Sequence, residues 1–96
     1  MNEGIDIAFM GAKVAASKSQ AASIAVHTLS ASYNIAQIAH YRALCAGLQN
    51  AQLSNGVQVN VEAMNQYRNE LTKHTILAAC DTLSLILIGL VGINNR

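Results

Sequence analysis

The chain contains no proline, and no glycine interrupts it between Gly11 and Gly47. Proline and glycine are the residues that most often end or bend a helix. Their absence over this distance favours a helix far longer than the globular average of about 11–12 residues. A second stretch without either residue runs from Val61 to the residue before Gly89. The sequence therefore predicts two long helices.

We expect an all-α fold, a long antiparallel two-helix hairpin that forms a single domain over residues 1–96. Its helices cover about residues 5–48 and 61–91, and a polar turn covers about residues 49–60, where Ser54, Asn55 and Gly56 give the strongest turn signal. Such a hairpin is thin. The chain is 52% hydrophobic, but sixteen of its residues are alanine, which offers little apolar area for a core. We therefore expect oligomerisation to complete the fold.

Apolar and small side chains occupy more than one face of the predicted first helix, where Lys13, Lys18 and Arg42 are the only charges between Gly11 and Leu48. Alanine and glycine recur there at four-residue spacing. This pattern permits close helix crossing, although the helix propensity of alanine explains it equally well. The predicted assembly interface consists of Met10, Val14, Ala21, Ile24, Leu29, Tyr33, Ile35, Ile38, Leu83, Leu85, Leu87 and Leu90.

The end of the predicted second helix, residues 75–93, contains one charged residue, Asp81. Its length approaches the roughly 20 apolar residues that cross a bilayer. However, a carboxylate within a membrane costs a few kcal/mol, and the uninterrupted apolar part after it, Thr82 to Ile93, is only twelve residues long. These features favour a helix buried among protein subunits. Asp81 is then a buried charge that needs a partner, and Lys13, Lys18 and His27 are the partners considered.

Charge and motif content argue against several classes of site. Six basic and five acidic residues nearly cancel, so we expect no binding of nucleic acid. His27 and His40 are too far apart on one helix to share a metal ion, and we interpret Glu70 and His74 as a solvated ion pair. Motifs for a nucleophilic serine or a phosphate loop are absent from the sequence. We expect no enzyme activity, cofactor, metal or small-molecule substrate.

The N-terminal residues and the two cysteines bear on the cellular location. The N-terminal segment contains Glu3 and Asp6 and lacks the positive start and long apolar run of a secretory signal. We therefore expect a cytoplasmic protein, or one exported without a cleavable signal, and membrane association stays possible. Cys45 and Cys80 match no metal-binding spacing. We expect two buried thiols, with a disulfide as the alternative if the hairpin brings them to one height.

The leading functional hypothesis is a structural subunit that self-assembles into a filament, tube, ribbon or secreted appendage. Its partners are copies of itself, which pack through the apolar and small-residue faces. The first alternative is a small membrane protein, holin-like or pilin-like, with a span at about residues 75–93 and lipid as its partner. A further alternative is a dimeric helical adaptor or secretion chaperone.

The outline of two helices and a central turn resembles several families in architecture. It is similar to the small secreted helical hairpins of the WXG type, to needle-type secretion subunits and to conjugative pilins. The Trp-x-Gly turn of the first family is missing, because the chain has no tryptophan and reads Gln-Leu-Ser-Asn-Gly at residues 52–56. No motif of the needle subunits or pilins matches residue by residue, so the resemblance is one of architecture only and assigns no residue a role.

Overall fold

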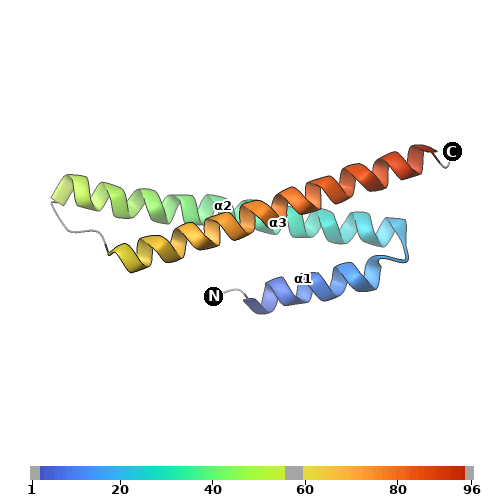
Figure 1. Cartoon of the computed structure of the whole chain (residues 1–96), viewed down its shortest axis with the longest axis horizontal. Helices are drawn as coiled ribbons and strands as arrows, with labels where there is room; N and C mark the ends of the chain where they lie inside the picture. The colour runs from blue at the N-terminus through green and yellow to red at the C-terminus, as the bar shows by residue number, and fades with distance from the viewer. Residues whose placement is uncertain (1–2, 56–59, 95–96) are drawn as a thin grey trace.

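A computed structural model describes residues 3–55 and 60–94, and this part of the chain is all-helical. It contains three helices, α1 (Glu3–Ala16), α2 (Gln20–Asn55) and α3 (Val61–Asn94) (Figure 1). The predicted fold class, all-α, is therefore confirmed. The prediction of two helices is wrong, because the expected first helix is divided into α1 and α2, and α2 continues beyond residue 48.

The division between α1 and α2 falls at Ser17, Lys18 and Ser19, where serine groups replace the lost helical hydrogen bonds. The Ser17 hydroxyl donates to the Val14 carbonyl at 2.7 Å, and the Ser19 amide donates to the Ala16 carbonyl at 3.0 Å. Ser19 also caps α2, since its Oγ accepts the Ala22 amide at 3.3 Å. Serine is tolerated inside helices as well as at caps, so the sequence alone did not reveal this end.

Helices α2 and α3 lie side by side and run in opposite directions, and α1 lies along the N-terminal part of α2 (Figure 1). Asn60 caps α3, because its Oδ1 accepts the Ala63 amide at 3.1 Å. The register of the α2–α3 pair is marked by contacts of Gln20 with Ile88, His27 with Asp81, and Asn34 with His74. The expected turn over residues 49–60 begins later than predicted, and its residues 56–59 lie outside the described part of the chain.

The molecule is long and thin, with principal extents of 61 × 24 × 14 Å. Where the three helices meet, the interior is largely polar. The buried polar or charged residues are Ser23, Ser30, Asn34, His74 and Asp81, whereas the buried hydrophobic residues are Ala16, Tyr41, Met64 and Ala78. No Leu, Ile or Val among the described side chains is buried, so the usual aliphatic core is missing from the single chain.

Aliphatic side chains lie instead on the outside of all three helices. Val14 is 75% exposed, Leu29 is 63% exposed and Leu87 is 61% exposed. The other large hydrophobic side chains with high exposure are Ile5, Ile7, Met10, Ile24, Ile35, Val61, Ile76, Leu83, Ile86, Leu90 and Val91. The fully buried positions around the three-helix junction are thus mostly polar, while many aliphatic side chains are exposed, which is unusual for a soluble domain.

Candidate functional site: a buried polar network beneath apolar outer faces

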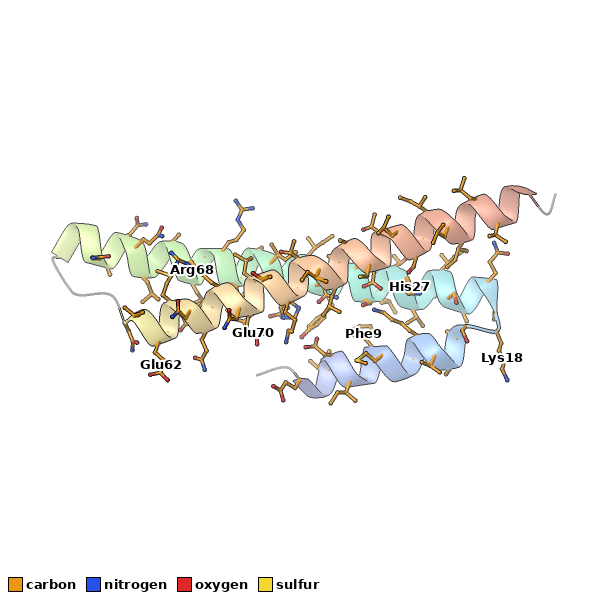
Figure 2. The ribbon with its side chains drawn as sticks, in the orientation of Figure 1. Phe9, Lys18, His27, Glu62, Arg68 and Glu70 are labelled. Atoms are coloured by element: carbon orange, nitrogen blue, oxygen red, sulfur yellow. The ribbon has the colours of Figure 1, made fainter. Side chains whose placement is uncertain are left out.

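Asp81 on α3 lies at the centre of a buried cluster to which all three helices contribute. Its side chain is 0% exposed. Lys13 on α1 donates to its Oδ1 at 2.7 Å, and the Ser30 hydroxyl on α2 donates to its Oδ2 at 2.6 Å. The His27 Nδ1 atom lies 2.8 Å from Oδ1. Of the three partners considered from sequence, the structure brings Lys13 and His27 to Asp81, while Lys18 points away from the helices at the α1–α2 turn (Figure 2).

The contacts around Asp81 keep its carboxylate charged. Burial alone would raise the pKa of Asp81, but the hydrogen bonds from Lys13, Ser30 and His27 outweigh burial and hold that pKa below its usual value. The carboxylate is therefore ionised at neutral pH and is matched by the Lys13 ammonium. A buried pair of this kind is sensitive to the loss of either member, because the remaining charge is left without compensation.

His74, about two helical turns before Asp81 on α3, forms a second buried cluster. It is 0% exposed, so its expected place in a solvated ion pair is wrong. Its Nδ1 donates to the Asn34 Oδ1 at 2.6 Å, and its ring contacts that of Tyr33 edge-on and stacks on that of Tyr41, with centroids 5.8 and 6.0 Å away. Tertiary packing across α2 therefore decides the environment of His74, although Glu70 Oε2 still lies 3.5 Å from its Nε2.

The charge of His74 follows from this environment. Burial, and after it the Lys73 ammonium, lower the pKa of His74 below its usual value, so the imidazole is neutral at pH 7. The Asn34 amide donates to the Ser30 carbonyl at 2.9 Å and lies 3.4 Å from the Ser30 hydroxyl. Asn34 and Ser30 thereby connect the His74 cluster with the Asp81 cluster. We use the name polar network for six side chains: Lys13, His27, Ser30, Asn34, His74 and Asp81.

A second ion-pair set ties the beginning of α1 to α3. Lys73 Nζ lies 2.8 Å from the Asp6 Oδ2 and 2.9 Å from the Glu70 Oε2. Burial favours the neutral amine, but the hydrogen bonds to Asp6 and Glu70 outweigh it and raise the pKa of Lys73. Because the Lys73 side chain is 35% exposed, solvent weakens this set relative to the Lys13–Asp81 pair.

The predicted assembly residues are distributed over the outside of the three helices. Nine of them are exposed: Met10 and Val14 on α1, Ala21, Ile24, Leu29 and Ile35 on α2, and Leu83, Leu87 and Leu90 on α3. Tyr33, Ile38 and Leu85 are half-buried within the chain. The structure therefore leaves most of this set accessible to a partner, and their role as an interface stays a prediction.

The cysteines lie far apart in the antiparallel pair. Cys80 is next to Asp81, which faces His27, whereas Cys45 is eighteen residues beyond His27, or about 27 Å along α2. This separation is too great for a disulfide within the chain, and both thiols are free. Cys80 is exposed, so the expectation of two buried thiols is wrong for that residue.

Sequence reasoning did not identify Ser30, Asn34 and His74 as interior residues. A usable signal was present, because Ser30 and Asn34 are four residues apart and His27 and Asn34 are seven apart, as are His74 and Asp81. These spacings place polar side chains on one face of each helix. In helices with few charges, a single polar face indicates the interior as readily as it indicates solvent.

The acidic, basic and amide side chains of the polar network form hydrogen bonds and an ion pair with one another. Among residues 3–55 and 60–94, His, Cys, Asp and Glu side chains form no group of three that could hold a metal ion.

The segment Val61–Gly92 of α3 is long and apolar enough to cross a membrane, and 11% of its most apolar window is buried within the chain. Comparisons with protein-family models, curated proteins and solved structures find no match to this chain.

Proposed function

We propose that the chain is a structural subunit that assembles with copies of itself into an extended filament, tube or ribbon. The observation that carries this proposal is the distribution of side chains, with a buried polar cluster at the three-helix junction and large aliphatic residues exposed on the outside of all three helices. A 96-residue chain without an aliphatic core is marginal in water. Neighbouring copies supply the missing core when they cover these faces.

The exposed aliphatic residues are sufficient in number to drive association. Full burial of one such side chain stabilises by about 1.5–3 kcal/mol. These side chains are 42–75% exposed in the single chain, so each gains roughly half of that value, and burial of about ten of them, contributed by two copies together, offsets the roughly 4–15 kcal/mol that association costs in lost freedom and ordering. Among the side chains that the structure describes, fourteen large hydrophobic ones are exposed, so each copy has enough for more than one contact.

The small residues of α2 suit the close approach of a second helix. A straight row of exposed small side chains runs along α2 through Ala21, Ala25, Thr28, Ser32, Ala36, Ala39, Ala43 and Gly47. The Ser32 hydroxyl is satisfied by the Thr28 carbonyl at 2.9 Å, and a Cβ at Gly47 would meet no atom within 4 Å. This row is about 39 Å long, and its small side chains permit a second helix to pack closely against it.

The placement of the apolar faces supports an open assembly over a closed one. Val14 on α1, Leu29 on α2 and Leu87 on α3 are all exposed, so the surface extends over every helix. A two-fold dimer covers one patch on each copy and leaves the others in water. Contacts between different patches continue from copy to copy, and they produce a filament or sheet when the rotation does not close.

The test compares outer-face variants in buffer without detergent, using light scattering and negative-stain microscopy. We expect the unaltered protein to form extended particles, and we expect Leu87→Lys to reduce them, because an ammonium cannot be buried between copies. Lys18→Arg is the matched control, since Lys18 is already exposed and charged. Dispersed single chains of the unaltered protein, with helices intact, would contradict the proposal.

A second candidate function, membrane insertion, is favoured by the part of α3 that exposes no charge. From Thr75 to Gly92 the helix exposes no charged side chain, and Asp81 is enclosed by Lys13 and His27. The exposed hydroxyls of Thr75 and Thr82 are satisfied by carbonyls one turn earlier, as hydroxyls are in lipid-facing helices. Extraction of membranes with alkaline carbonate distinguishes the two functions, because a membrane-inserted chain stays with the lipid and an assembled one is released.

A further inference from the structure

Helix α1 is held to the rest of the chain mainly by its polar inner face. Lys13 and Asp6 make its ion pairs with α3, at 2.7 and 2.8 Å, and the Phe9 ring packs on the Tyr33 ring with centroids 5.6 Å apart. A cavity of about 190 Å³ lies between α1 and the α2–α3 pair, lined by Phe9, Lys13 and Leu77 among others. The packing of α1 is therefore incomplete, and specific polar contacts locate it.

The connection between α1 and α2 is compatible with a straight helix. Ser17, Lys18 and Ser19 are all exposed and include neither proline nor glycine. Serine costs only about half a kcal/mol relative to alanine inside a helix. The same residues that form the reversal therefore permit α1 to continue the axis of α2. Short hinges of this kind allow one copy to donate an element to another.

The site that receives α1 is incomplete without it. Asp81 is 0% exposed, and Lys13 is the one lysine among its partners in the described part of the chain. If α1 leaves, the carboxylate keeps Ser30 and His27 but loses its matching charge. An α1 helix from any copy satisfies the site equally well, because the chemistry is the same.

We propose that, in the assembly, α1 of one copy docks on the α2–α3 pair of the next copy and places its Lys13 against that copy's Asp81. This inference rests on the proposed function. Each copy then donates one helix and accepts one, which is a head-to-tail contact that gives the assembly a direction. The outer side chains of α1, among them Met10 and Val14, at 62% and 75% exposed in the single chain, are carried into the space between copies.

The test uses charge reversal on separate chains. We expect Lys13→Asp and Asp81→Lys, each alone, to reduce sedimentable assemblies roughly tenfold or more, because like charges then meet in a buried site. Mixing the two variants restores assembly if α1 is exchanged, since each chain supplies the complement that the other lacks. The double variant K13D/D81K restores the pair within one sequence, and Lys18→Asp is the control for charge reversal at an exposed position.

Cross-linking gives a second measurement on chains that keep the Asp81 cluster. Phe9→Cys and Tyr33→Cys are placed on separate chains that also carry Cys45→Ser and Cys80→Ser, and the mixture is treated with a short bismaleimide after assembly. Linked dimers on a denaturing gel are expected. A second sample carries both cysteines on one chain. If assemblies of the mixture give no linked dimers and this second sample links within one chain, the exchange of α1 is overturned and the proposed function stands. Failure of the unaltered protein to assemble overturns both.

Discussion

Replacement of Lys13 by methionine tests the importance of the buried ion pair. The Asp81 side chain is 0% exposed and that of Lys13 is 20% exposed. Removal of one partner from a buried pair costs about 3–5 kcal/mol, because the other charge remains in the interior. Asp81 keeps Ser30 and His27, so we expect the lower end of that range, about 3 kcal/mol. This value is a large fraction of the roughly 5–15 kcal/mol that stabilises a typical domain.

The loss is measurable as the urea concentration at which half of the helical circular dichroism signal disappears, at one fixed protein concentration. Small proteins lose about 1–3 kcal/mol of stability per molar urea. A loss of about 3 kcal/mol therefore lowers the midpoint by roughly 1–3 M. Lys18→Met removes the same charge from an exposed position, and we expect it to change stability by less than about 0.5 kcal/mol.

A double-mutant cycle separates the ion pair from other effects of the substitution. In K13M/D81N the remaining carboxylate is neutralised as well, so the double variant is expected to lose less stability than the two single variants together. The coupling energy is expected to be about 2 kcal/mol, within the range for residues in one network. Equal midpoints for Lys13→Met and Lys18→Met, or additive losses in the cycle, would refute the reasoning.

Three further predictions follow from other contacts. Because burial lowers the pKa of His74, stability is lost as the pH falls below about 6.5, which is the histidine pKa in an unfolded chain. We expect His74→Gln to remove this loss, and urea midpoints at pH 7.5 and 5.5 measure it. Asp6→Asn lowers stability by less than about 1 kcal/mol in the same assay, since Lys73 is partly exposed and keeps Glu70. Gly47→Leu leaves the helix content unchanged but reduces assembly in light scattering, because it fills the small-residue row; undiminished assembly would exclude that row as an interface.

The helical fold was predictable because long stretches without proline or glycine permit little else in a chain of this composition. The end of α1 was not predictable in the same way. Ser17 and Ser19 fit either a helix or a cap, and the reversal is linked to the pairing of Lys13 with Asp81, which are 68 residues apart. Local propensity carries no information on such a contact.

The candidate site was accessible to sequence reasoning only in part. A lone carboxylate in an apolar stretch requires a partner, and this rule identified Asp81, Lys13 and His27. Sequence reasoning did not find the burial of His74, because Glu70, four residues earlier on the same helix, was a sufficient local partner. The structure places His74 against Asn34 instead, and only the register of α2 against α3 brings those two residues together.

Sedimentation velocity of the detergent-free protein over a range of concentrations tests most directly whether copies of the chain supply its missing core. We predict species far larger than the 10.2 kDa chain, with helix content that falls as dilution dissociates them. A single species of 10.2 kDa, or a discrete dimer, that keeps its helix content at every concentration would contradict the account.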